Sequence, residues 1–405
     1  MVQMESIKLI LAGWLMDGTG TPAKKNRILK INGKKIESIY DAAPAAIENF
    51  DITDLSHCTI LPPLTDSHVH LFMSGTSDPD IRSSQLNAEF DHIKNVISNH
   101  LNQHLSHGIL HVRDGGDSRA HTLCYKKKCH DKNKNPVLIK TAGKAWRNNG
   151  RYGKLIGRPP KNNTTLARAI LKESHGIDHV KIINSGLNSL IHFGKETPPQ
   201  FSEKSLMDAV NAAKSLELQV MVHANGKIPV NSAIKAGCDS IDHGFFMGIK
   251  NMEIMAEKNI FWVPTAYTMK AYSKILDKNS AESAGALKNF ESQIEQMALA
   301  RKLEVPLALG TDSGSLGVHH GKSMIEELKI FMEAGYSIAG AVKCAAFNGA
   351  KLLGIKEGGI IAPKKPATFL AVAGSPSDLP ESLAQIEQIF INSRPIVDPE
   401  NWTIC

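Results

Sequence analysis

The chain has 405 residues, of which 42% are hydrophobic and 21% are charged, and its formal net charge at pH 7 is +7. No apolar run approaches the roughly 18 residues that a membrane span requires, so we expect no association with a membrane. The six cysteines are scattered without a CxxC pair, which favours a reduced, cytoplasmic protein.

The first part of the chain, residues 1–56, predicts a small β-rich unit. Short apolar runs such as "SIKLILAG", "RILKING" and "KKIESIY" are separated by turn residues. Residues 358–405 have the same character, in "ATFLAVAG" and "IEQIFINSRPIV". We therefore expect the two ends of the chain to pair into one small β-sandwich domain.

The central part, residues 57–357, alternates short apolar strands with amphipathic helices. We predict strands at 58–64, 109–114, 137–142, 178–183, 219–223, 239–242, 260–264 and 305–310. Two helices have clear ends, at 202–217 with Ser202 as N-cap and at 321–335 with a closing glycine. Eight strands that alternate with helices predict an α/β fold, a parallel (β/α)8 barrel of the TIM type.

A basic region lies between Arg119 and Lys161, where thirteen lysines and arginines accompany one acid, Asp131. It is either an electropositive rim that attracts an anionic substrate or a solvated surface. The sequence has no nucleic-acid reader motif and no interleaved aromatic platform, so we expect no nucleic-acid partner.

The stretch "LPPLTDSHVHL" (61–71) contains two histidines, His68 and His70, which are separated by one residue. They lie at the end of the first predicted barrel strand. Side chains alternate along a strand, so His68 and His70 should project from the same face. Two imidazoles on one face suit a metal ion, and a surface strand with solvated histidines is the alternative.

Ionisable residues also end or interrupt later strands. Catalytic groups of parallel barrels lie at the C-terminal ends of the strands. The residues at or near these positions are Asp66, Lys181, His223, His243 and Asp312. Burying so many ionisable groups at one barrel mouth is unfavourable unless they are paired or metal-bound, so we predict a metal centre.

The motifs "DSHVH", "HVK", "MVHANG", "SIDHG" and "LGTDSG", in this order, resemble those of the amidohydrolase superfamily of metal-dependent hydrolases. The resemblance covers nearly the whole chain. The lysine of the fourth strand and "GVHHG" after Asp312 are similar to the subgroup of prolidase-like dipeptidases and zinc-dependent carboxypeptidases.

The resemblance implies a centre with two Zn²⁺ ions per chain. One ion would be held by His68, His70 and Asp312, and the other by His223 and His243. Lys181, carboxylated by carbon dioxide, would bridge them as a carbamate, with a hydroxide as the second bridge. The hydroxide would attack the substrate carbonyl, and Asp312 would carry its proton to the leaving amine.

The resemblance further implies a small-molecule substrate, a dipeptide or N-acyl amino acid with a free carboxylate. Hydrolysis of a carbamate, urea or lactone on the same centre is the alternative. A deaminase would carry a glutamate three residues after the fifth-strand histidine, where this chain has Gly226. A metal-free structural relative is disfavoured because every ligand position is filled.

Candidate substrate residues lie in the loops after the strands. The loop "GKAWRNNGRYGKLIGR" (143–158) departs from the glycine- and histidine-rich loop of the related dipeptidases. It supplies Arg147, Arg151, Tyr152 and Arg158, which either hold a carboxylate or face solvent. Tyr267 is a candidate pocket wall, and His320 is a candidate contact to the leaving group.

Two further residues, Arg113 and Asp114, end the second strand. They either orient a metal ligand or form a buried ion pair with each other. The sequence leaves a homo-oligomer open.

Overall fold

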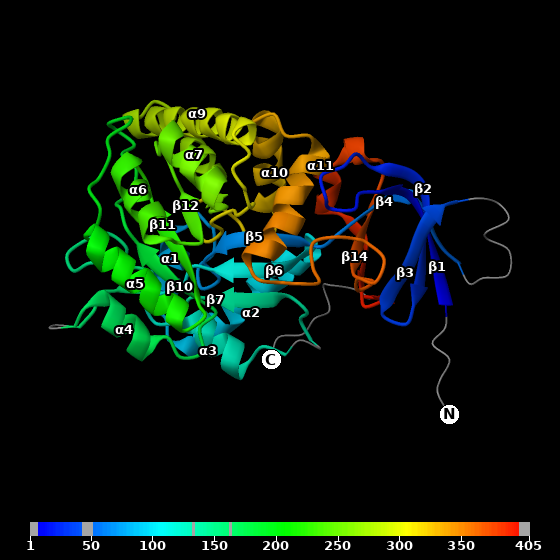
Figure 1. Cartoon of the computed structure of the whole chain (residues 1–405), viewed down its shortest axis with the longest axis horizontal. Helices are drawn as coiled ribbons and strands as arrows, with labels where there is room; N and C mark the ends of the chain where they lie inside the picture. The colour runs from blue at the N-terminus through cyan, green and yellow to red at the C-terminus, as the bar shows by residue number, and fades with distance from the viewer. Residues whose placement is uncertain (1–6, 43–51, 132–133, 162–163, 397–405) are drawn as a thin grey trace.

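The computed structural model describes residues 7–42, 52–131, 134–161 and 164–396 (Figure 1). Across these ranges, no helix combines the length and the hydrophobicity needed to cross a membrane. The α-helices are α1 (Pro79–Asn87), α2 (Phe90–Ser106), α3 (His121–Lys128), α4 (Leu166–Glu173), α5 (Glu203–Ser215), α6 (Lys227–Ala236), α7 (Ile249–Lys258), α8 (Tyr267–Ile275), α9 (Ala281–Lys302), α10 (Ser323–Glu333), α11 (Ile338–Lys343) and α12 (Gly349–Leu352).

Both ends of the chain contribute to one seven-stranded sheet, as predicted, with the order β16-β15-β14-β4-β1-β2-β3. Its strands are β1 (Ile7–Leu15), β2 (Lys24–Asn32), β3 (Lys35–Asp41), β4 (Ile52–Leu61), β14 (Phe369–Ala373), β15 (Ile386–Ile391) and β16 (Arg394–Pro395). The sheet has its own apolar core, in which the rings of Phe369 and Phe390 stack 4.7 Å apart. Figure 1 shows it at one end of the molecule, beside the barrel.

The strand predicted at 58–64 is wrong in its bounds. β4 ends at Leu61 within the seven-stranded sheet, and the first barrel strand begins anew at Leu64. Pro62 and Pro63 separate the two strands, because proline has no N–H for a sheet hydrogen bond. β4 thus runs across the boundary at residue 57 that the sequence predicts.

The barrel strands pair in parallel. They are β5 (Leu64–Val69), β6 (Ile109–Asp114), β7 (Leu138–Thr141), β8 (Ala145–Trp146), β9 (Gly157–Arg158), β10 (His179–Ile183), β11 (Gln219–Ala224), β12 (Ser240–His243) and β13 (Phe261–Val263). They form one sheet of order β5-β6-β7 and another of order β13-β12-β11-β10-β8-β9. The Asp178 N–H donates to the Thr141 carbonyl at 2.9 Å and links the two sheets.

The eighth predicted strand, 305–310, occupies its place in the barrel without forming a regular strand. Ala308 N–H donates to the Trp262 carbonyl, and the Leu309 carbonyl accepts from Ser67 N–H, each at 2.9 Å, so the segment joins β13 to β5. Leu309 N–H instead donates to the carbonyl of Cys344, in a π-helical turn (344–348). The ladder is therefore interrupted, while the (β/α)8 arrangement is complete.

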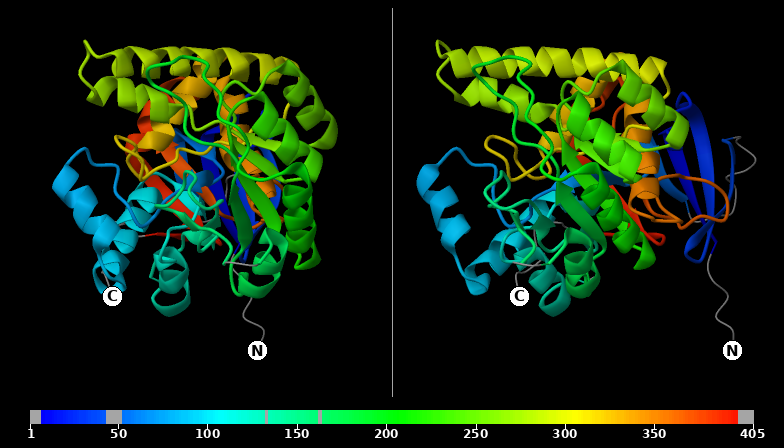
Figure 2. Two further views of the ribbon diagram at one scale, coloured as in Figure 1. Left: turned by 90° about the vertical axis from the view of Figure 1, so that its left-hand side faces the viewer. Right: turned by 60° about the vertical axis from the view of Figure 1, so that its left-hand side comes forward.

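Helices cover the outside of the barrel (Figures 1 and 2). α5 and α10 match the helices predicted at 202–217 and 321–335, and the Ser202 hydroxyl caps α5 by accepting from Ser205 N–H. Figure 2 shows α8 and α9 side by side over one part of the barrel. The first turns of α8 border the cavity described below, so α8 forms part of its wall.

Candidate metal centre and cavity

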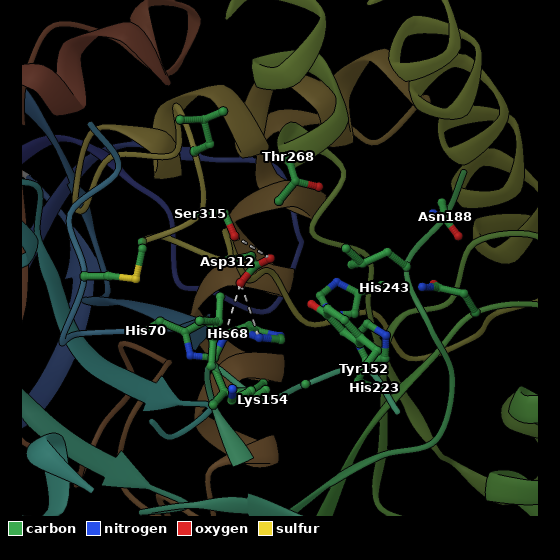
Figure 3. Close-up of a pocket in the computed structure, with 18 of the residues that line it drawn as sticks. His68, His70, Tyr152, Lys154, Asn188, His223, His243, Thr268, Asp312 and Ser315 are labelled. Atoms are coloured by element: carbon green, nitrogen blue, oxygen red, sulfur yellow. Dashed lines mark hydrogen bonds and ion pairs between the residues drawn. The ribbon is translucent and has the colours of Figure 1, made fainter. Parts of the chain in front are cut away.

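The predicted ligands converge on the floor of one cavity at the C-terminal ends of the strands (Figure 3). Asp312 Oδ1 lies 3.5 Å from Nε2 of both His68 and His70. The rings of His223 and His243 are 4.6 Å apart, and the ring of His68 is 5.0 Å from that of His243. Side chains from four separate segments of the barrel thus face one point.

Three of the four imidazoles, those of His70, His223 and His243, have one ring nitrogen within hydrogen-bond distance of a protein oxygen. His70 Nδ1 is 3.0 Å from the Gly116 carbonyl, and His243 Nδ1 is 2.7 Å from the Thr265 hydroxyl. His223 is held through Nε2, 3.2 Å from the Gly186 carbonyl. The other nitrogen of each ring is left for a metal ion, which is the arrangement that metal-ligating histidines adopt.

A buried carboxylate, Asp242, lies beneath the centre. Its Oδ2 is 2.6 Å from Lys181 Nζ and 3.1 Å from His68 Nδ1. Its Oδ1 accepts from the Arg113 guanidinium at 3.0 Å, and Arg113 also donates to the Ser67 carbonyl at 2.7 Å. Arg113 therefore pairs with Asp242 rather than with its neighbour Asp114.

Asp114 and Asp66 position the backbone around the ligands. Asp114 accepts from Leu71 N–H, just after His70, at 3.0 Å. Asp66 accepts from the backbone N–H and hydroxyl of Thr311 at 2.9 and 2.6 Å, next to Asp312. Both carboxylates hold ligand-bearing segments in place.

Burial keeps the centre's imidazoles neutral, the form that can ligate a metal. It lowers the pKa of His70 and of His223 to about 4, with a further contribution from the charge of Lys181. Burial also lowers the pKa of Lys181, against the opposing effect of Asp242, and raises the pKa of Asp312 to about 7.

Three residues around the centre adopt the left-handed backbone region that favours glycine. They are His243 (φ 67°), Thr265 (φ 45°) and Asp312 (φ 59°), each at the end of a barrel segment. Such conformations are unfavourable by about 1–3 kcal/mol each, and they persist where surrounding contacts enforce them. Here they turn ligand side chains into the cavity.

The donor set fits a divalent metal ion. One ligand atom from each of His68, His70 and Asp312 lies within 4.8 Å of the others. Imidazole and carboxylate are ligands that Zn²⁺ prefers.

Comparison with protein families gives a match to the amidohydrolase family over residues 59–397. The chain belongs to the amidohydrolase family. This confirms the relationship that the strand-end motifs predicted. It also agrees with the barrel and the second, β-rich domain described above.

Two relatives illustrate how far the similarity of this amidohydrolase extends. An ochratoxinase from Aspergillus niger is 31% identical over 154 residues, which are 37% of this chain and 31% of the relative's length. A solved Xaa-Pro dipeptidase with bound methionine in its active site is 26% identical, with a TM-score of 0.77, and the match covers 96% of this chain and 100% of that one. The A. niger ochratoxinase structure has 19% identity and a TM-score of 0.78 over 98% and 97% of the two chains, a likeness of fold.

The cavity of this amidohydrolase has a volume of about 430 Å³. Apolar side chains form much of its wall, including Phe72, Met73, Leu187, Phe245 and Met269. Besides Lys181 at the centre, three basic side chains line the same cavity, those of Arg82, Arg151 and Lys154. A small ligand with an apolar part and an anionic group would fit this lining.

Two of the four candidates from the loop 143–158 line the cavity. Tyr152 lies with its ring 5.4 Å from that of His223, and Arg151 donates to the Pro198 carbonyl at 2.9 Å. Arg147 does not line the cavity. It donates to the carbonyls of Asn148 and Arg151 and so stabilises the loop.

Other residues of the basic region 119–161 fit either the solvated surface or the electropositive rim that the sequence left open. Lys126 and Arg158 form ion pairs with Asp178 and Glu173 on the outer surface. Lys154, in contrast, reaches the cavity. Part of the excess positive charge is thus neutralised locally, and part faces the centre.

Tyr267 and His320 lie outside the cavity. Tyr267 begins α8 and lines a separate pocket with Lys274 and Glu326, because the turn at Thr265 directs Thr268, Met269 and Tyr272 to the centre instead. The His320 ring stacks on His100 at 3.9 Å, and its two nitrogens face His104 and the Met73 carbonyl. It is a buried structural histidine behind the centre.

Asp242 and Arg82 were not predicted from the sequence as residues of the site. Asp242 directly precedes His243, and Ser240 and Asp242 lie on the same face of a short predicted strand, which was a usable signal for an inward-facing carboxylate. Arg82 sits in a polar helix after the first ligand pair, and no local pattern marks it as facing the cavity.

Proposed function

We propose that this protein hydrolyses an amide or peptide bond of a small substrate such as a dipeptide or an N-acyl amino acid. The observation that carries the proposal is the convergence of Asp312, four imidazoles and Lys181 on the floor of a cavity of about 430 Å³. Similarity to a dipeptidase over nearly the whole chain supports it.

The ligands would hold two Zn²⁺ ions, one with His68, His70 and Asp312 and the other with His223 and His243. Lys181 would lie between them as a carbamate, formed when its neutral amine bonds to the carbon of CO₂ and releases a proton. Burial lowers the pKa of Lys181, so the neutral amine that reacts with CO₂ is more accessible than in an exposed lysine. When bound, the ions would polarise the substrate carbonyl and acidify a water molecule.

Asp312 would act as the proton carrier. Its Oδ2 accepts from the Ser315 hydroxyl at 3.0 Å, which leaves Oδ1 directed at the histidines (Figure 3). The carboxylate would take a proton from the attacking water and transfer it to the nitrogen of the leaving amine. Asp242 would keep the Nδ1 proton of His68 in place, so that Nε2 remains available.

The cations of the wall would bind a carboxylate of the substrate. Arg82 is half-buried, and within the described residues no carboxylate pairs with it. The methionine bound by the similar dipeptidase carries such a carboxylate, which supports this assignment. We also propose a cytoplasmic location, which the scattered cysteines without a CxxC pair favour.

The test is to reconstitute the protein with zinc and bicarbonate and to screen dipeptides, N-acyl amino acids, carbamates, ureas and lactones. We expect about two ions at the centre and activity on the first two classes. Asp312→Asn should remove this activity. A protein that binds no zinc at the barrel centre, or that prefers carbamates or lactones, would contradict the proposal.

A further inference from the structure

A second group of metal-ligating side chains lies in the seven-stranded sheet. It consists of His57 and Cys58 on β4 and Glu387 on β15, and we call it the sheet cluster. One ligand atom from each residue lies within 4.8 Å of the others, and His57 Nε2 is 3.1 Å from Glu387 Oε1. These residues do not line the barrel cavity, so the cluster is separate from the proposed active site.

A β-bulge in β4 creates half of the cluster. Residues 56–58 of β4 lie opposite the single residue Gly13, because the pairing with β1 shifts between Ala12 and Trp14. A Cβ on Gly13 would come within 2.1 Å of the Ser56 carbonyl oxygen, so glycine is required beside this bulge.

The bulge explains how two neighbouring residues can serve one site. In a regular strand, His57 and Cys58 would face opposite sides of the sheet. On β15, Glu387 is also an extra residue, since the pairing with β14 shifts next to it. Gly374 N–H donates to the His57 carbonyl at 2.9 Å and keeps the end of β14 between the two bulges.

The chemistry of the cluster suits a borderline cation. Thiolate, imidazole and carboxylate together are ligands of Zn²⁺. The Cys58 side chain is buried beneath His57 and Glu387, whose side chains are 55% and 43% exposed. Burial and the charges of Glu387 and Asp54 raise the pKa of the Cys58 thiol to about 11. A cation would reverse this effect, because it stabilises the thiolate and the carboxylate together.

We propose that the sheet cluster is a structural metal site that binds Zn²⁺ through Cys58 Sγ, a ring nitrogen of His57 and a carboxylate oxygen of Glu387. The thiol proton leaves to solvent as the metal–sulfur bond forms, and water completes the tetrahedron. β4 precedes the barrel and β15 follows it, so the ion links the two ends of the chain across β14. The site is independent of the proposed hydrolysis.

The test uses Co²⁺ as a spectroscopic substitute for Zn²⁺ in the full chain. A thiolate ligand gives a charge-transfer absorption in the near ultraviolet, and the predicted barrel ligands include no cysteine. We therefore expect this band in the wild-type protein, with one metal ion more than the barrel centre binds. Zinc should also raise the Tm of a variant whose barrel centre is disabled by His68→Ala.

Variants of the cluster decide the outcome. Cys58→Ser should abolish the band, and Glu387→Gln, a surface change that preserves the fold, should weaken Co²⁺ binding at this site at least about tenfold. Cys124→Ser is the matched control and should leave the band unchanged. Absence of the band in the wild type, its retention in Cys58→Ser, or unchanged affinity in Glu387→Gln would overturn the proposal, whatever the hydrolase activity.

Discussion

Arg82 offers a direct test of whether the cavity recognises a carboxylate. The residue lies in α1, and its Nη1 donates to the carbonyls of Ser74 and Gly314 at 2.9 and 3.3 Å. These bonds aim a half-buried guanidinium at the cavity without neutralising its charge. We expect Arg82→Met to impair the hydrolysis of a substrate that has a free carboxylate much more than that of its carboxamide.

The magnitude follows from the interaction that is lost. A hydrogen bond to a charged group contributes about 1.5–3 kcal/mol, which corresponds to roughly 10- to 150-fold in kcat/KM. Arg82→Met also removes the bonds to Ser74 and Gly314, and this loosening should affect both substrates alike. The ratio of kcat/KM for the acid to that for the carboxamide therefore isolates the recognition of charge.

The assay compares an N-acyl amino acid with its carboxamide, and chromatography measures the released amino acid or amino acid amide. Arg151→Met tests the other candidate for this role, because Arg151 lines the same cavity and its guanidinium donates to the Pro198 carbonyl. Arg82→Lys should retain part of the preference. If the acid-to-amide ratio stays at the wild-type value in Arg82→Met, Arg82 does not bind the carboxylate, and a fall only in Arg151→Met assigns that role to Arg151.

Three further changes test the centre and its surroundings. Lys181→Ala should lose most activity and at least one metal ion, and added formate should partly restore the activity. Lys181→Met leaves no space for formate and should not be rescued. Equal rescue of both variants would contradict a bridging carbamate. His104 is buried and its folded-state pKa is lowered to about 3, so the unfolded chain binds more protons below pH 6.5 and stability falls as the pH falls. His104→Phe should make this decline shallower by up to about 1.4 kcal/mol per pH unit in urea unfolding between pH 6 and 4, and an unchanged slope would refute the assignment. Burial raises the pKa of Glu327 to about 8, so the folded chain binds the extra proton between about pH 4.5 and 8 and stability falls as the pH rises through this range. Glu327→Gln should flatten that dependence in the same assay, and a dependence as steep as in the wild type would exclude Glu327 as its source.

Local sequence patterns predicted the features of this fold that depend on near neighbours. β6 has the bounds predicted for it, because a short apolar run ends there at two charged residues. The pair His68 and His70 follows from the alternation of a single strand. The barrel itself was predictable because most of its strands pair with strands close to them in the chain, joined by helices.

Features that depend on backbone turns were not predictable in this way. Tyr267 was expected to end a strand and face the cavity, whereas the chain turns at Thr265 and begins a helix, which presents Thr268 and Tyr272 instead. Likewise, His243 leaves the strand alternation at φ 67°, so both it and its neighbour Asp242 face inward. Asp242 finds its partners Lys181 and Arg113 at sequence separations of 61 and 129 residues, beyond any local pattern.

The position of Asp242 makes the state of Lys181 depend on the metal. Carboxylation would convert Lys181 from a cation to an anion, a change of two charges beside a buried carboxylate that lies 2.6 Å from Nζ. Without bound cations this change is unfavourable, and the Lys181–Asp242 ion pair prevails. Cations held by the neighbouring imidazoles would offset the new charge, while Arg113 at 3.0 Å continues to neutralise Asp242. Because coupling between two binding events is reciprocal, bicarbonate should raise the affinity for zinc by the same factor by which zinc favours the carbamate.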